Sequence, residues 1–129
     1  MAAAPSFIAT PVAATVTLST ANVAVDGTGA ITDLLTGSTL GTRVLEVVIQ
    51  GTQQTAAGLV NLFLYNGTAW FLFDQVTVAA QTGNTAAKGT RVATQYTNLV
   101  LPNTWKLGCT LTVAPISGTV RVTALGGSL

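Results

Sequence analysis

Apolar and polar residues alternate along much of the chain, and an alternation with a period of two is typical of half-buried β-strands. The pattern is clearest at residues 105–113 and 119–124, where every second residue is apolar. These two segments are predicted to send Trp105, Leu107, Cys109, Leu111, Val113, Val120 and Val122 inward. No stretch of ten or more residues shows convincing helical spacing. Further strands are predicted at 14–20, 31–36, 43–50, 59–65, 69–78, 90–95 and 98–101.

Residues that favour turns separate the predicted strands. Asp26-Gly27-Thr28-Gly29 predicts a turn, and residues 79–89 form a polar loop of small residues. Asn66-Gly67 predicts a two-residue type I′ hairpin turn, because Asn and Gly tolerate positive φ. Eight or nine short strands joined in this way predict an all-β fold, an antiparallel β-sandwich that is jelly-roll-like.

Two of these segments are apolar on both faces. In 43–50 one face carries Val44 and Val48, and the other carries Leu45, Val47 and Ile49. In 69–78 the side chains of Trp70, Phe71 and Phe73 alternate between faces. A two-layer sandwich covers one face of each sheet, so the other face is predicted to be a subunit interface. Closed symmetry would bury it, and a homotrimer is the expected state of the homo-oligomer.

The aromatic run has a second interpretation as a platform for sugars or bases. A binding platform usually carries polar groups at fixed positions beside the rings, and few such groups adjoin Trp70, Phe71 and Phe73 in the sequence. We therefore favour a contact surface over a ligand platform.

The first thirteen residues differ from the remainder in being rich in Ala and Pro. We expect an extended N-terminal arm at residues 1–13, followed by a single β-sandwich domain at residues 14–129. Phe7, Ile8 and Val12 of this arm are predicted to contact a neighbouring subunit, with a frayed terminus as the alternative. Residues 125–129 are predicted to be a flexible tail or to be held by a neighbour.

Charged side chains are scarce, at 7% of the chain against about a quarter in an ordinary globular protein. The chain has no His, a single Cys109 and only four acidic residues, so we expect no enzyme, no catalytic residue, no metal site and no cofactor. The five scattered cations and a net charge of +1 argue against a nucleic-acid partner. No apolar run approaches the roughly 18 residues of a membrane span, so no membrane partner is expected.

A series of motifs runs through the central and C-terminal part of the chain. In order they are Gly41-Thr42-Arg43-Val44-Leu45-Glu46-Val47-Val48-Ile49, Ala57-Gly58-Leu59-Val60-Asn61-Leu62-Phe63-Leu64-Tyr65-Asn66-Gly67, Ala69-Trp70-Phe71-Leu72-Phe73-Asp74-Gln75-Val76, Leu101-Pro102-Asn103-Thr104-Trp105 and Gly126-Gly127. Together they resemble the small virion structural proteins of tailed bacteriophages, over roughly residues 25–129.

This resemblance implies a head-decoration or cement protein that binds the phage major capsid protein and has no enzymatic activity. It also implies a place on the capsid surface of the virion, after assembly in the cytoplasm of a bacterial host. A tail or fibre component is the alternative within the virion. The alternative from another class is a carbohydrate-binding module that uses Trp70 or Trp105.

Overall fold

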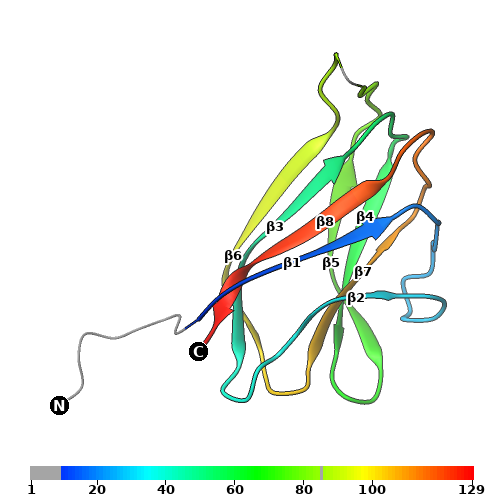
Figure 1. Ribbon diagram of the computed structural model, residues 1–129. Helices are drawn as coiled ribbons and strands as arrows, with labels where there is room; N and C mark the ends of the chain where they lie inside the picture. The colour runs from blue at the N-terminus through cyan, green and yellow to red at the C-terminus, as the bar shows by residue number, and fades with distance from the viewer. Residues whose placement is uncertain (1–9, 85) are drawn as a thin grey trace.

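The protein, described by a computed structural model over residues 10–84 and 86–129, is a sandwich of two four-stranded sheets (Figure 1). Sheet A has the order β1-β8-β3-β6 and sheet B the order β2-β7-β4-β5, with every pair antiparallel. The strands are β1 (Thr10–Leu18), β2 (Thr32–Thr36), β3 (Thr42–Gly51), β4 (Gly58–Tyr65), β5 (Trp70–Val78), β6 (Arg91–Leu101), β7 (Lys106–Leu111) and β8 (Val120–Ser128). The prediction of an antiparallel all-β sandwich is confirmed.

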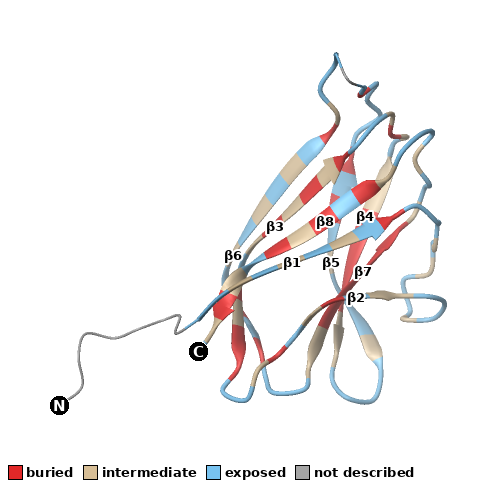
Figure 2. Ribbon diagram, viewed as in Figure 1, coloured by how far each residue is buried: buried red, intermediate tan, exposed pale blue. Residues whose placement is uncertain are grey.

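The strand pairs nest inside one another along the chain. β1 pairs with β8, β2 with β7, β3 with β6 and β4 with β5. The four strands of the second half of the chain therefore pair with those of the first half in reverse order. Burial of apolar surface between the sheets is the main stabilising contribution. Figure 2 shows buried and exposed positions alternating along β8, as the sequence pattern predicts for a half-buried strand.

The clearest alternation in the sequence does supply the core. Its predicted inward residues Leu107, Cys109, Leu111, Val120 and Val122 are all buried between the sheets. The remaining two differ, because both lie outside β7: Trp105, before its start, is half-buried against the core, and Val113, after its end, is exposed.

The face assignment predicted for residues 43–50 is wrong at its start. The register of β3 shifts between Val44 and Glu46 against both of its neighbours, which makes Leu45 a bulged residue. Val44 therefore joins Val47 and Ile49 in the core, whereas Leu45 is exposed. An extra residue in a strand exchanges the two faces beyond it, which a strict period of two does not anticipate.

The two ends of the chain pair with each other in sheet A. β1 starts at Thr10, which lies opposite Ser128 in β8, and the pairing continues to Leu18 opposite Val120. The predicted boundary at residue 13 is therefore wrong, because residues 10–13 belong to the sheet. Residues 1–9 lie outside the described residues. The predicted flexible tail is also wrong for 125–128, which continue β8.

The connection between β1 and β2 folds over part of the outer face of sheet B. The Ala21 backbone bridges to Leu111 of β7, and Asn22 Nδ2 donates hydrogen bonds to the carbonyl oxygens of Thr28 and Ala30 at 3.1 and 3.0 Å. The predicted turn at Asp26 is present, with Asp26 Oδ1 accepting from Thr28 N at 3.1 Å. This connection supplies a third layer over a few residues of sheet B.

The hairpin between β4 and β5 is confirmed, but the predicted two-residue type I′ turn is wrong. Tyr65 pairs with Trp70, so the connection consists of residues 66–69. A type I′ turn would need positive φ at both Asn66 and Gly67, and only Gly67 has it, at 93°. Asn66 contributes through its side chain, whose Oδ1 accepts from Thr68 N and Ala69 N at 3.0 Å each. Such side-chain turns are a common use of Asn.

Replacing Gly67 by valine is expected to lower the free energy of unfolding by about 1–2 kcal/mol, because a β-branched residue resists positive φ. Nothing lies within 4 Å of the position that a Cβ would take, so the effect is conformational and not steric. Urea unfolding measures it. A Gly67→Asn variant should be milder, since Asn tolerates this region, and equal stability of the Gly67→Val variant and the wild type would contradict the assigned turn.

Candidate functional site

The residues predicted to form contacts have different environments. Phe7 and Ile8 lie outside the described residues. Val12 is half-buried in β1 opposite Gly126 of β8, so it belongs to the sheet. On β5, Phe71 is 55% exposed and Phe73 39% exposed. The structure thus keeps Phe71 and Phe73 as surface candidates.

Trp70, by contrast, is half-buried on the outer face of sheet B. A Cβ on Gly108 would lie 2.6 Å from its ring, and Ile31 from the connection approaches the same point. Tyr65, its partner across the hairpin, contacts it with ring centroids 5.0 Å apart. Trp70 therefore packs against the sheet and is not an exposed platform.

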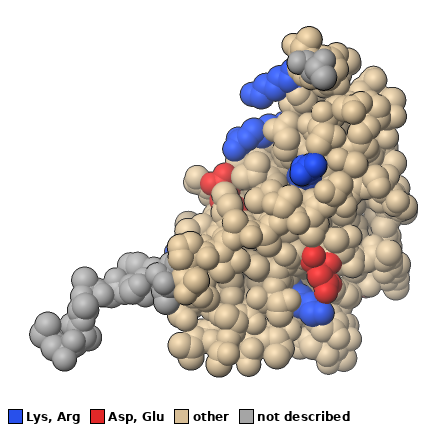
Figure 3. Space-filling view, in the orientation of Figure 1, with Lys and Arg blue, Asp and Glu red and all other residues tan. Residues whose placement is uncertain are grey.

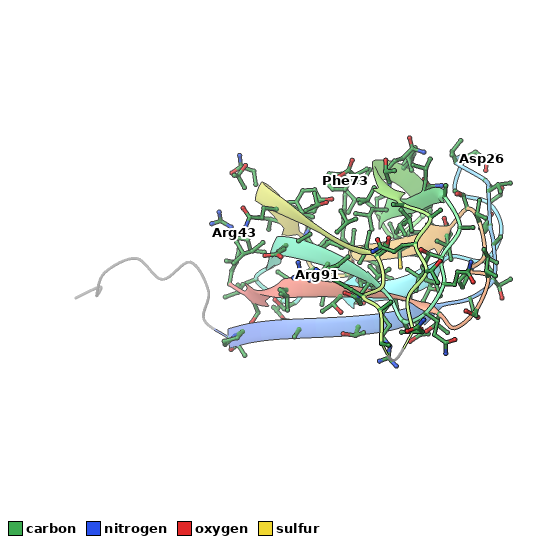
Figure 4. The ribbon with its side chains drawn as sticks, turned by 90° about the horizontal axis from the view of Figure 1, so that it is seen from above. Asp26, Arg43, Phe73 and Arg91 are labelled. Atoms are coloured by element: carbon green, nitrogen blue, oxygen red, sulfur yellow. The ribbon has the colours of Figure 1, made fainter. Side chains whose placement is uncertain are left out.

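A hollow of about 320 Å³ opens at the edge of the sandwich between β5 and β6. Figure 4 shows Phe73 at this edge, where the two edge strands come together. The lining consists of Phe73, Gln95, Tyr96, Thr97, Asn98 and Leu99. Leu99 of this lining is buried, whereas Gln95 and Asn98, which carry the two amide side chains, are exposed at its rim. The volume is at the low end of the range for small-ligand sites.

Both edge strands are irregular at this hollow. On β5 the register passes from Leu72 to Asp74, so Phe73 is an inserted residue. On β6 the register passes from Gln95 to Leu99, so residues 96–98 leave the regular pairing with β3. The strands predicted at 90–95 and 98–101 are joined through this segment into the single strand β6. Bulges are frequent at sheet edges and beside functional sites, because they redirect side chains.

Hydrogen bonds hold both bulges in place. Tyr96 Oη donates to Asp74 Oδ2 at 2.7 Å, which ties β6 to β5 across the opening. The rings of Phe73 and Tyr96 are in tilted contact, with centroids 5.5 Å apart. Arg43 Nη2 donates to the Thr97 carbonyl oxygen at 2.7 Å and so satisfies an acceptor of the β6 bulge. Burial and the Asp74 carboxylate raise the pKa of Tyr96, which therefore remains a donor.

A second exposed surface lies at the end of sheet A where β1 begins. Leu40 is 78% exposed, and Val100 and Leu129 both lie close to Gly41 beside it. We call Leu40, Val100 and Leu129 the apolar end. This surface was not predicted from the sequence, because its members come from a turn, an edge strand and the C-terminus. Thr10, the first described residue, lies in the same row of the sheet as Ser128, Thr42 and Leu101.

Charged side chains form small, separate groups on the face seen in Figure 3. On sheet B, Lys106 Nζ and Asp33 Oδ2 form an ion pair at 3.1 Å. The Asp74 carboxylate accepts hydrogen bonds from Tyr96 Oη and from the backbone N–H of Gln75.

Reactive groups do not converge among the described residues. They contain no group of three or more His, Cys, Asp or Glu side chains able to hold a metal ion. In the same residues no helix is long and apolar enough to cross a membrane. Cys109 is buried as a free thiol in the core, and burial raises its pKa to about 12.

Alkaline solution is expected to destabilise the fold through Cys109. The unfolded thiol ionises near its ordinary pKa of 9.0, whereas the folded thiol keeps its proton to about 12. The contribution of this thiol to the free energy of unfolding is therefore fully present below pH 9 and is lost as the pH rises above it, by about 1 kcal/mol between pH 9 and about pH 10. Urea unfolding of wild type and Cys109→Ala measures the difference. Parallel pH profiles of the two proteins would contradict the prediction.

Comparison with known proteins gives no relative: no family model, no curated protein and no solved structure matches this chain.

Proposed function

We propose that this protein is a non-enzymatic structural component of a tailed-phage virion, and that it decorates the head by binding major capsid subunits. The observation that carries the proposal is the apolar end, Leu40, Val100 and Leu129, which gathers exposed apolar side chains on one end of a rigid sandwich. Burial of apolar surface contributes about 25 cal/mol per Å² before the costs of association. Repeated copies on a lattice would strengthen the attachment further.

The arrangement of the strands supports this proposal. The nested pairs from β1·β8 to β4·β5 are the arrangement expected of a jelly roll, an architecture that viral capsid proteins use. The jelly-roll assignment made from the sequence stays a prediction that this nesting supports. The resemblance to phage virion proteins points the same way.

Self-association is part of the proposal. A homotrimer would let three copies present their apolar ends to one capsid site, and Phe71 offers a further exposed contact on β5. A protein that sediments as a stable monomer at micromolar concentration would contradict the trimer. Tail or fibre membership is the alternative, and it predicts few copies per particle.

A carbohydrate-binding module built on Trp70 or Trp105 receives less support. Both side chains are half-buried, and Trp70 lies against Gly108. Neither offers the exposed ring face that such a module needs.

The decisive experiment follows the full chain into virions. Heads and tails are separated, and the chain is quantified by mass spectrometry in each fraction. We expect it with heads, at a copy number set by the capsid lattice. Recovery with tails would overturn the decoration role and favour the fibre alternative.

A variant tests the surface itself. Leu40→Asp should abolish attachment to heads while the fold remains intact, because this side chain is already exposed. Ile116→Asp is the matched control, since Ile116 is 63% exposed in the β7–β8 connection, toward the opposite end of the sheets. Equal attachment of both variants would remove the apolar end from the proposal.

Deletion of residues 1–9 tests the arm. This deletion spares β1, whereas removal of all thirteen residues would take away four residues paired with β8. We expect weaker attachment with unchanged stability. Full attachment of the shortened chain would leave the arm without a role in assembly.

A further inference from the structure

We propose that the hollow between the β5 and β6 bulges binds a neutral carbohydrate, with Phe73 as the ring on which a sugar stacks. This site adjoins the apolar end along β6, where Leu99 of its lining precedes Val100, but it uses none of the three residues of that end and neither Trp residue. It therefore adds a binding function to the structural role and does not depend on it.

The construction of the hollow is the first argument. Two irregularities on two different strands meet at one place: the inserted Phe73 on β5 and the segment from Tyr96 to Asn98 on β6. A bulge interrupts the ladder at a cost in backbone hydrogen bonds, and here the irregular segments of the two edge strands line the same hollow.

The chemistry of the lining is the second argument. The face of an aromatic ring is negative, so it attracts the polarised C–H groups on the apolar face of a sugar. Phe73 is partly exposed beside Gln95 and Asn98, whose side chains make no hydrogen bond within the described residues. A side-chain amide both donates and accepts, which matches neighbouring hydroxyl groups that also do both.

The absence of charge in the lining selects the class of ligand. None of the six lining residues is charged. The nearby Asp74 carboxylate already accepts hydrogen bonds from Tyr96 Oη and from Gln75 N, at 2.7 and 2.8 Å. An anionic sugar would gain no ion pair from the lining, whereas a neutral glycan can satisfy its hydroxyl groups on the amides. The hollow of about 320 Å³ suits a short stretch of such a glycan.

The site is also organised in advance. Tyr96 is fixed by its bond to Asp74 and by contact with the Phe73 ring, and Arg43 holds the carbonyl of Thr97. Side chains that are ordered before binding lose less entropy when the ligand arrives. Arg43 acts here as a positioning residue, because it reaches the backbone of the bulge and not the hollow.

The test is a titration of the full-length ¹⁵N-labelled protein, followed by NMR. The probes are tetrasaccharides of the malto, cello, chito and galacto series, with a sialylated lactose as the anionic probe. We expect saturable shifts with at least one neutral probe, confined to the backbone amides around Phe73 and those from Gln95 to Leu99. No response to any neutral probe, a response only to the sialylated probe, or shifts elsewhere would overturn the proposal.

Variants identify the groups that bind. Phe73→Ala should weaken binding by about tenfold or more, equivalent to about 1.4 kcal/mol. Phe71→Ala, which removes a more exposed ring of the same strand outside the lining, should leave affinity unchanged. The double variant Gln95→Ala, Asn98→Ala removes rim amides without internal partners, so it tests the site even if Phe73→Ala disturbs the edge. Unchanged affinity in this folded double variant would overturn the proposal.

Discussion

Replacement of Phe63 by alanine is expected to lower the free energy of unfolding by about 3–5 kcal/mol, the usual range for a fully buried Phe. Phe63 is completely buried, although it points to the face of sheet B opposite the main core. Its partners in the adjacent strands are Gly108 and Leu72, and the Trp70 ring and Ile31 lie over Gly108. Removing the ring would leave a cavity beneath this cover, which the connection between β1 and β2 helps to form.

Urea unfolding with Phe71→Ala as the matched control checks this expectation. Both residues are Phe side chains in the β4–β5 hairpin, but Phe71 is largely exposed, so its loss should change stability by less than about 0.5 kcal/mol. Equal effects of the two substitutions would mean that the outer layer contributes no packing. A loss confined to Phe63→Ala would establish a second small core on this sheet.

Replacement of Gly126 by alanine is expected to cost about 3 kcal/mol, the upper end of the range for overpacked sites. A Cβ at this position would collide with the carbonyl oxygen of Arg43 and lie 3.0 Å from Val44 Cα. Both obstacles are main-chain atoms of β3, so no side-chain rotation relieves the clash. The two strands would have to separate beside the β3 bulge.

Gly67→Ala is the control, because it adds the same methyl group at a positive φ where nothing lies within 4 Å. Its expected cost is about 1 kcal/mol and purely conformational. Amide hydrogen exchange should also rise along the β8–β3 pairing in Gly126→Ala and remain unchanged in Gly67→Ala. A smaller loss for Gly126→Ala than for Gly67→Ala would contradict the close approach of β8 to β3.

Local pattern was sufficient where a strand is regular and half-buried. The alternation in residues 106–111 and 120–124 predicted both strand type and core positions, since a period of two admits one inward face. Turn chemistry likewise located the hairpin at Gly67, although Asn66 serves through its side chain and not through its own φ.

The candidate sites were beyond local pattern, because each one combines segments that are distant in the sequence. Phe73 was predicted to be a surface residue, but its position in a hollow depends on Tyr96 and Asn98 from another sheet. The apolar end was missed for the same reason, since Leu40 and Leu129 are separated by most of the chain. An alternation pattern describes the two faces of a single strand and does not show which segments lie side by side in the fold.

The amino-acid sequence by itself therefore determined the all-β class, the strand locations and the core of the regular strands. Only the tertiary structure decided the bulges at Leu45 and Phe73, which depend on how neighbouring strands pair. Tertiary structure also decided that Trp70 is covered. The residue that lies beside its ring, Ile31, belongs to the connection between β1 and β2, which is separated from Trp70 in the chain by β2, β3 and β4. The physical reason is that side-chain period is set within a strand, whereas register and coverage are set by contacts between segments.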